Sequence, residues 1–418
     1  MAIACQGGGS HTAFTAGALK GLLRPGALAG REIVGLSGTS GGAVCALLAW
    51  SALRERAPER VGELLDAFWA DTAASSPPER ALNAWTVWAS SLQEVVTLPA
   101  VSPYDTPLTL SGADAFKRAL TRLVDFGAIT ADGAPPLLIV GAVDVLSGRF
   151  RTFDSRRERI SAEMILASAA VPTLFRSVRL DDGVYWDGLF SQNPPVRELV
   201  DARPDEIWVV QINAQAIDAE PRSVIDIADR RNELAGNLSL NQELHFIEKI
   251  DQMLEAGDLP RGGRYKTIVV RVIELSRPRF SRSLGPASKL NRDPAFLAEL
   301  IAHGEAQAGE FLAALDFEDA WRRRDVDALA AFFADDAVLA SAAPFGEHAH
   351  GDGKITPQLL DRLARGLTLD LTRKQIARDR VTWTVRAGGP GERVAGRAEA
   401  TFRSGRVVAL TLGSGTTG

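Results

Sequence analysis

The stretch from Ile33 to Leu53 contains no charged residue, and it constrains the fold more than any other part of the chain. Its length would suit a membrane-spanning helix. However, four glycines and several hydroxyl residues fall within its first ten positions. This composition suits a strand, a tight turn and a buried helix better than a span that faces lipid. The stretch therefore predicts the centre of a folded domain.

On both sides of this stretch, apolar runs bounded by glycine alternate with segments of helical period. This alternation predicts an α/β domain with a mostly parallel sheet covered by helices. The expected strands are Ala2–Cys5, Glu32–Leu36, Leu137–Val143, Val178–Trp186, Glu206–Ile212 and Thr267–Val272. The expected helices are Thr12–Leu23, Gly42–Arg54, Ala113–Leu123, Ser161–Ala169 and Ser223–Glu255.

The pattern changes after the expected helix Pro294–Leu315. A second helix is expected over Phe317–Ala334, because it starts with acidic residues and carries aromatic residues on one side. Alternating segments then predict antiparallel strands at Ala377–Val385, Val394–Phe402 and Arg406–Leu412. We place a domain boundary at about Asp316, which gives domains of residues 1–315 and 317–412.

Composition excludes several classes of protein. The 418 residues are 46% apolar and 24% charged with a net charge of −5, as in an ordinary soluble globular protein without a basic surface for nucleic acid. The cysteines, Cys5 and Cys45, suit neither a disulfide framework nor a zinc site, which favours a reducing compartment. The N-terminus lacks the basic and apolar regions of a secretory signal. We therefore expect a cytoplasmic protein that binds no nucleic acid.

The sequence Gly38-Thr39-Ser40-Gly41-Gly42 lies between an apolar strand and an apolar helix. A G-x-S-x-G element in this position predicts a nucleophile elbow, because its glycines permit a strained turn that exposes the Ser40 hydroxyl at a helix N-terminus. The amides and dipole of that helix end favour developing negative charge. The alternative is a turn of small residues that serves only packing.

A second glycine-rich turn, Gly7-Gly8-Gly9, follows the first strand and precedes a helix. Its backbone N–H groups could point at an anion. Thr12 stands where a dinucleotide motif needs its third glycine, and a phosphate-binding loop would need a Gly-Lys pair that is missing. An oxyanion hole fits better. The alternative is a tight turn without a ligand.

The third element is Trp186-Asp187-Gly188-Leu189, which follows a strand and leads to Asn193-Pro194-Pro195. In this order and spacing, GGGSHTAFTAG, GTSGG and DGLFSQNPP resemble the patatin-like phospholipase family over roughly residues 1–315. The resemblance implies a three-layer α/β/α sandwich. It also implies a catalytic dyad of Ser40 as nucleophile and Asp187 as its partner, with an oxyanion hole made by the amides of Gly7, Gly8 and Gly9.

Two positions depart from the pattern of that family. His11 and Thr12 stand where a basic residue and a glycine are usual, which affects the electrostatics of the pocket. Leu189 stands where glycine or alanine usually follows Asp-Gly, which bears on substrate shape more than on chemistry.

Histidines offer a competing triad. His245 and His303 follow Asp187 in the chain order of an α/β-hydrolase, but each lies in a helical pattern, so surface or core roles are favoured. His348 and His350 have metal-compatible spacing without a third ligand, so solvated loop histidines are favoured. No calcium-loop signature occurs. We therefore expect no metal and no cofactor.

Tryptophans 69, 85 and 88 mark the stretch Trp69–Leu98, which has few charges in its middle. It suits a lid or an interfacial surface for lipid, since indole rings suit the membrane boundary. A core helix that packs against the sheet explains the same residues. Contact with a membrane surface is therefore an expectation with an open alternative.

The C-terminal segment, Phe317–Leu412, contains AWRRRDVDAL and FFADDAV followed by strands, and it resembles the ketosteroid isomerase and polyketide cyclase superfamily. The resemblance implies a small α+β domain with a curved sheet. Isomerase chemistry needs a tyrosine as oxyanion donor, and Tyr104, Tyr185 and Tyr265 all lie outside the segment. A module for binding, or for forming a homo-oligomer, is therefore favoured over a second enzyme.

The leading hypothesis is a serine acyl hydrolase that cleaves carboxylic esters of lipids, a patatin-like esterase with phospholipase A-type activity. Two alternatives stay open. One is a catalytically silent scaffold that binds lipid or a protein partner, and the other is an acyltransferase that uses the same dyad.

Overall fold

The computed structural model describes residues 1–28, 30–93, 102–105, 108–172, 174–217, 219–260, 262, 265–275, 284–341, 349–350, 355, 357, 368–377, 380–387 and 394–413. The chain divides into two compact units. The first consists of Met1–Thr267 and Glu274–Glu305, and the second of Ile268–Ile273 and Ala306–Gly418.

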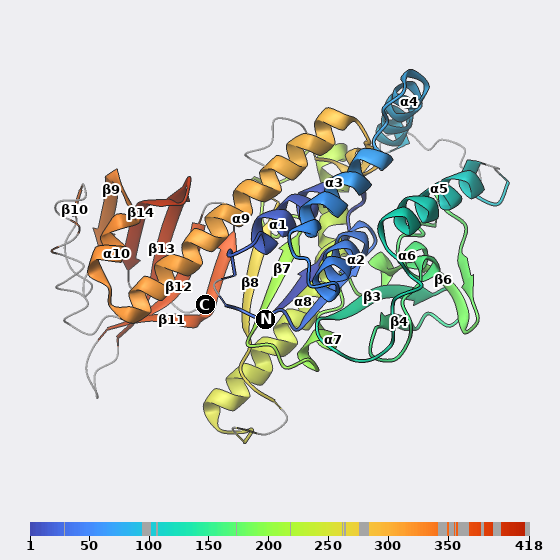
Figure 1. Ribbon diagram of the computed structural model, residues 1–418. Helices are drawn as coiled ribbons and strands as arrows, with labels where there is room; N and C mark the ends of the chain where they lie inside the picture. Colours follow the sequence, from blue (N-terminus) through green and yellow to red (C-terminus); the bar gives the residue numbers. More distant parts are fainter. Residues whose placement is uncertain are drawn as a thin grey trace. The chain divides into compact units, whose positions relative to one another are not determined.

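The first unit is built on a large sheet (Figure 1). Its strands are β1 (Ala2–Cys5), β2 (Gly35–Thr39), β3 (Leu137–Asp144), β4 (Phe150–Asp154), β5 (Val178–Leu180), β6 (Gly183–Asp187) and β7 (Glu206–Gln211). From β5 to β7 the order is β5-β6-β3-β2-β1-β7, and β4 also pairs with β3. The pairs of β1 with β2 and β7, and of β2 with β3, are parallel, whereas β4 and β6 run antiparallel to β3.

Helices precede and follow these strands. They are η1 (Gly9–Thr12), α1 (Ala13–Leu23), α2 (Gly41–Arg54), α3 (Arg60–Thr72), α4 (Pro77–Gln93), α5 (Leu108–Leu123), α6 (Ala162–Ser168), η2 (Gly188–Phe190), α7 (Arg197–Val200), α8 (Val224–Ala256), η4 (Pro286–Leu290) and α9 (Pro294–Arg323). In the described part of the chain, no helix is both long enough and apolar enough to cross a bilayer.

Helix α1 and the start of α9 pack backbone against backbone. A Cβ atom added to Gly17 would lie 1.9 Å from the carbonyl oxygen of Ile301, and one added to Gly304 would lie 2.1 Å from that of Phe14. Real Cβ atoms do not approach so closely, so glycine is required at both positions for this contact. The helix that follows the glycine-rich turn is therefore held directly by α9.

The second unit contains a six-stranded sheet. The strands of that sheet are β9 (Phe333–Ser341), β10 (Ala349–His350), β11 (Thr368–Ala377), β12 (Arg380–Ala387), β13 (Val394–Arg403) and β14 (Arg406–Gly413). The unit also contains the end of α9, α10 (Val326–Ala331) and β8 (Val269–Glu274), which is not part of this sheet and extends one residue into the first unit. The order in that sheet is β10-β9-β14-β13-β12-β11, antiparallel except for β14 with β9. The ring of Phe317 lies about 6 Å from those of Trp383 and Phe402, and together they form part of the core.

The predicted fold class is confirmed: a large, mostly parallel sheet with helices, and a separate small sheet. Two helix predictions near Asp316 were wrong. One helix, α9, runs through that position because no glycine or proline interrupts Leu315–Arg323, and β9 begins at Phe333 within the second predicted helix. The domain limits 1–315 and 317–412 stay a prediction.

Strand positions also differ in places. The segment Val178–Trp186 forms two antiparallel strands, β5 and β6, which are joined by a two-residue turn at Asp181-Asp182. Strand β2 lies three residues later than predicted and ends directly before Ser40. Of the histidines expected in a loop, His350 lies in β10 and His348 lies outside the described residues.

Candidate active site

Ser40 occupies the bend between β2 and α2. Its backbone has φ 56° and ψ −130°, a conformation that costs free energy for a residue with a side chain. The bend is possible because glycines surround it: a Cβ atom on Gly42 would lie 2.3 Å from the carbonyl oxygen of Cys5. The strand-to-helix turn predicted around Ser40 is therefore present, and it places the serine at the N-terminus of α2.

The bend is held by a second serine. The Ser40 backbone N–H donates to Ser168 Oγ at 3.0 Å, and the Ser168 hydroxyl donates to the carbonyl oxygen of Gly141 at 2.6 Å. Ser168 is fully buried at the end of α6, and Gly141 lies in β3. Neighbouring elements therefore fix the strained backbone of Ser40. Nothing in the sequence distinguished Ser168 from other serines.

Asp187 is the last residue of β6 and contacts Ser40. Asp187 is 1% exposed and accepts a hydrogen bond from the Leu189 N–H at 2.8 Å, and the Ser40 side chain lies close enough to influence its pKa. Burial raises the pKa of the Asp187 carboxyl from 3.8 to about 7, although the Leu189 N–H and the Ser40 side chain oppose the shift. No described Lys, Arg or His forms an ion pair with it. Its proton is therefore exchangeable near neutral pH.

The glycine-rich turn lies beside Ser40. A Cβ atom on Gly7 would be 2.9 Å from the Cβ of Ser40. The Gly7 N–H donates to Asn193 Oδ1 at 2.7 Å, whereas no described residue accepts a hydrogen bond from the N–H of Gly8 or Gly9. Gly8 is half-buried and Gly9 is exposed. The structure thus brings Ser40, Asp187 and Gly7 together and leaves two backbone donors on the same loop unused.

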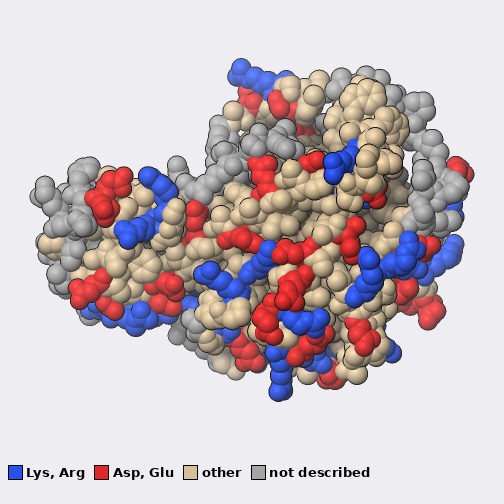
Figure 2. Space-filling model, turned by 45° about the horizontal axis from the view of Figure 1, so that its top comes forward, with Lys and Arg blue, Asp and Glu red and all other residues tan. Residues whose placement is uncertain are grey.

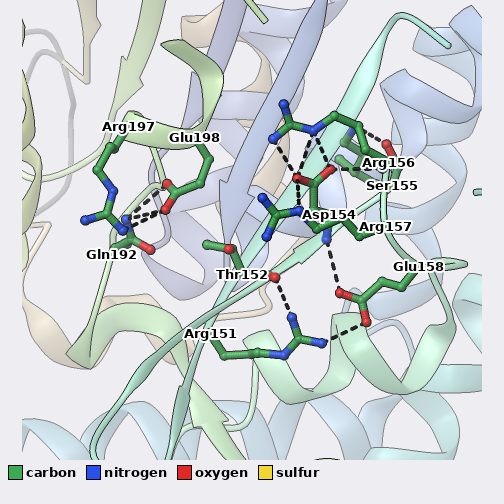
Figure 3. A network of polar contacts seen from close by, with 11 residues as sticks. Arg151, Thr152, Asp154, Ser155, Arg156, Arg157, Glu158, Gln192, Arg197 and Glu198 are labelled. Atoms are coloured by element: carbon green, nitrogen blue, oxygen red, sulfur yellow. Dashed lines mark hydrogen bonds and ion pairs between the residues drawn. The ribbon is translucent and has the colours of Figure 1, made fainter. Parts of the chain in front are cut away.

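The segment after Asp187 is anchored by polar contacts. The hydroxyl of Thr39, the residue before the nucleophile candidate, donates to the carbonyl oxygen of Gln192 at 2.6 Å. Gln192 Nε2 in turn donates to Glu198 at 3.1 Å and to Glu243 at 2.8 Å. Figure 3 shows the Gln192–Glu198 contact together with the pairs Arg151–Glu158 and Arg156–Asp154. These contacts fix the segment without touching Ser40.

The histidines do not form a triad. His245 lies on α8 with a side chain that is 78% exposed. The ring of His303 stacks on Phe14, with 5.6 Å between centroids. Neither is hydrogen-bonded to Ser40 or Asp187. His11, where the sequence departs from the family pattern, is buried and hydrogen-bonded to Ser288 Oγ at 2.7 Å.

Within the described ranges, no group of three or more His, Cys, Asp or Glu residues could hold a metal ion. The candidate site brings together a serine, a buried carboxyl group and backbone amides, which suits nucleophilic attack on a carbonyl.

The first unit is thus a mixed α/β domain whose candidate site lies where β2 and β6 end. Residues 3–200 match the family model described as patatin-like phospholipase. Over this range the chain is therefore similar to the patatin-like phospholipases. Among curated proteins, none matches this sequence.

Several solved structures match the C-terminal region of the chain. A candidate polyketide cyclase from Sinorhizobium meliloti has 23% identity, covers 24% of this chain and 92% of its own, and gives a TM-score of 0.21. An NTF2-like protein from Mesorhizobium loti has 22% identity, with coverages of 26% and 92% and a TM-score of 0.24. A candidate ketosteroid isomerase from Kribbella flavida has 17% identity, covers 26% of this chain and 80% of its own, and gives a TM-score of 0.23.

Proposed function

We propose that this protein is a serine acyl hydrolase that cleaves carboxylic esters of lipids, with phospholipase A-type activity. The observation that carries the proposal is that Asp187, which is buried and has a pKa of about 7, interacts with the side chain of Ser40 at the strained strand-to-helix bend. A carboxyl group with a pKa near the working pH can both accept and return a proton. The family of residues 3–200 supports the same class of reaction.

In the proposed reaction, Ser40 Oγ attacks the ester carbonyl while Asp187 accepts its proton. The N–H groups of Gly8 and Gly9 stabilise the oxyanion, because that of Gly7 is already bonded to Asn193. The C–O bond to the alcohol then breaks, and Asp187 returns the proton to the leaving oxygen. Water attacks the acyl-enzyme by the same route, releases the fatty acid and regenerates the Ser40 hydroxyl.

Two measurements test this proposal: labelling of the protein with a fluorophosphonate and, in a separate assay, turnover of short-chain nitrophenyl esters. We expect an adduct on Ser40, and at least a 10³-fold loss of turnover in Ser40→Ala. The matched control is Ser37→Ala, which removes a buried hydroxyl from β2 that has no hydrogen-bond partner among the described residues. Parental turnover by Ser40→Ala would contradict the proposal, and the absence of an adduct would favour the silent scaffold.

Hydrolysis and acyl transfer share the acyl-enzyme and differ in the acceptor. Turnover of a phosphatidylcholine in the presence of added glycerol separates them. We expect free fatty acid as the main product. Glycerol esters as the main product would instead identify an acyltransferase.

We also propose that α4 contacts the lipid surface that holds the substrate. Trp85 and Trp88 are 62% and 60% exposed, and residues 81–93 carry no charge. Asn83 bonds to Asn291 Oδ1 at 2.9 Å and accepts from the Arg292 N–H at 2.7 Å. With 3.6 residues per turn, the tryptophans lie on the helix side opposite Asn83. The apolar side of α4 therefore faces solvent, contrary to the predicted alternative of a core helix, whereas Trp69 on α3 is buried.

A neutral or zwitterionic lipid surface fits this helix best. Indole rings favour the membrane interface, and an uncharged segment gains nothing from anionic lipids. Acidic and basic side chains are interspersed over the face in Figure 2, without an extended area of one sign. Helix α4, which stands out from its unit in Figure 1, also packs against η4, which packs against η1 of the glycine-rich turn. The proposed lipid contact therefore borders the candidate site.

Flotation of the Ser40→Ala protein with phosphatidylcholine vesicles measures this contact without turnover. We expect Trp85→Gln/Trp88→Gln to bind at least tenfold more weakly. The matched control is Leu234→Gln/Leu238→Gln, which changes two similarly exposed residues on α8 and leaves binding unchanged. Equal loss in both variants, or a dimer that only the tryptophan variant loses, would contradict the proposed lipid contact.

A further inference from the structure

The Asn193 side chain makes both of its hydrogen bonds to one residue of the glycine-rich turn. Its Oδ1 accepts from the Gly7 N–H at 2.7 Å, and its Nδ2 donates to the Gly7 carbonyl oxygen at 3.4 Å. Asn193 is fully buried. Because a buried amide must satisfy its polar atoms, this pairing fixes the orientation of the peptide groups on both sides of Gly7.

The backbone of Asn193 is itself held from two directions. Its N–H donates to Ser239 Oγ on α8 at 3.1 Å, and its carbonyl oxygen accepts from Gln6 Nε2 at 3.4 Å. The same Gln6 side chain accepts from the N–H groups of Ile212 and Asn213, both at 2.8 Å. The amide that holds Gly7 is thus tied to α8 and to the end of β7, and it has little freedom to move.

Asn193 also belongs to the segment that begins with Asp187. That segment is joined to the Ser40 bend by the hydrogen bond from Thr39 Oγ1 to Gln192. The two hydrogen bonds from Asn193 to Gly7 extend this connection to the glycine-rich turn. A single stretch, residues 187–193, therefore touches all three parts of the candidate site.

We propose that Asn193 is a positioning residue, which holds the Gly7 peptide so that the N–H groups of Gly8 and Gly9 stay directed at the oxyanion. This inference rests on the proposed function. Asn193 contacts no reacting atom and acts only through the loop. Because an oxyanion bond forms fully in the transition state, a displaced loop lowers kcat more than it changes KM.

Steady-state kinetics of Asn193→Ala on a soluble ester test the proposal. We expect kcat to fall by about 30- to 300-fold, close to the loss of one oxyanion donor. KM should stay within about threefold, and the pH midpoint should not move, because Asp187 is untouched. The matched control is Asn237→Ala, which removes an equally buried amide bonded to Gln6 and not to Gly7. An equal loss of kcat in both variants, or a loss confined to KM, would overturn the proposal.

Ser239→Ala gives a milder test, since it removes the hydroxyl that accepts from the Asn193 N–H and keeps the buried amide. Ser239 is half-buried on α8, where alanine is well tolerated. We expect a three- to tenfold loss of kcat with KM unchanged. If Asn193→Ala does not fold, Ser239→Ala decides the question. A parental kcat in Ser239→Ala would then overturn the proposal.

Hydrogen exchange measured by mass spectrometry separates this inference from the proposed function. We expect Asn193→Ala, but not Asn237→Ala, to speed exchange in the peptide that contains Gly7–Gly9 by at least tenfold. Unchanged exchange would overturn the positioning role even in an active enzyme. A wild-type protein that turns over no ester, yet shows this difference in exchange, would refute the hydrolase and leave the contact from Asn193 to Gly7 intact.

Discussion

Asp187 in the first unit and Glu318 in the second are both carboxylates with 1% exposure, yet their partners differ. Glu318 accepts hydrogen bonds from Arg271 at 2.9 Å and from Trp383 Nε1 at 2.8 Å. Asp187 accepts a hydrogen bond from a backbone N–H and interacts with the Ser40 side chain, and it forms no ion pair with a described residue. One buried carboxylate is balanced by a cation, and the other is not.

This difference separates a structural role from a chemical one. A buried ion pair stabilises one arrangement of its neighbours, because breaking it leaves a charge without its partner. A buried carboxyl group without a cation has a raised pKa and can exchange its proton near neutrality. The comparison therefore assigns packing to Glu318 and proton transfer to Asp187, and each assignment makes its own predictions.

The largest expected effect is on turnover. Asp187→Asn should lower kcat/KM on a soluble ester by about 10³-fold or more, because it removes the proton acceptor and keeps the shape of the side chain. Asp182→Asn, at an exposed position just before β6, is the control and should stay close to the parental rate. Near-parental turnover by Asp187→Asn would contradict the assignment of proton transfer to Asp187.

The next effect is on stability. Glu318→Gln removes the negative charge that lies 2.9 Å from the buried Arg271, so the free energy of unfolding should fall by about 3–5 kcal/mol. Thermal or denaturant unfolding measures this loss. Replacing both partners, as Arg271→Met with Glu318→Gln, should recover part of it. A single variant as stable as the parent would show that the pair is not structural.

The third prediction concerns Asp187, whose replacement should raise the free energy of unfolding, whereas replacement of Glu318 lowers it. The unfolded carboxyl group ionises near 3.8 and the folded one near 7, so the wild-type protein loses stability as pH rises between these values. Asp187→Asn removes this loss. Above pH 7 the variant should be more stable than the parent by up to about 4 kcal/mol, and at pH 4 the difference should vanish. A gain that does not depend on pH would contradict the raised pKa.

The smallest effect is on the pH profile. Because Asp187 must be ionised to accept a proton, kcat/KM should rise with pH to a plateau with a midpoint near 7. Below the midpoint it should fall about tenfold per pH unit. Stopped assays on a soluble ester between pH 5 and pH 9 measure the curve. A midpoint near 4 would indicate a carboxyl group exposed to water.

The sequence predicted the parts of the site that depend on local order. Gly38–Gly42 permit only a sharp strand-to-helix turn, so the position of Ser40 followed from neighbouring residues. Asp187 was singled out because its motif directly follows a strand and resembles that of a known family. These local patterns needed no knowledge of distant contacts.

Contacts between distant residues could not be predicted in the same way. Asn193 meets Gly7 across 186 positions, and no periodicity marks an amide that will be buried. Glu318 was interpreted as part of the acidic start of a helix, whereas it lies inside α9 and pairs with Arg271. The packing of the whole chain decides which charges meet.

The close contact between α1 and α9 has a practical consequence. Gly17 and Gly304 leave no room for even one methyl group between these helices. The added methyl group of Gly304→Ala would clash with α1 and shift this helix, which follows the glycine-rich turn. Gly304 itself belongs neither to the proposed dyad nor to that turn. A single methyl group in the packing layer would therefore displace the glycine-rich turn without touching either residue of the proposed dyad.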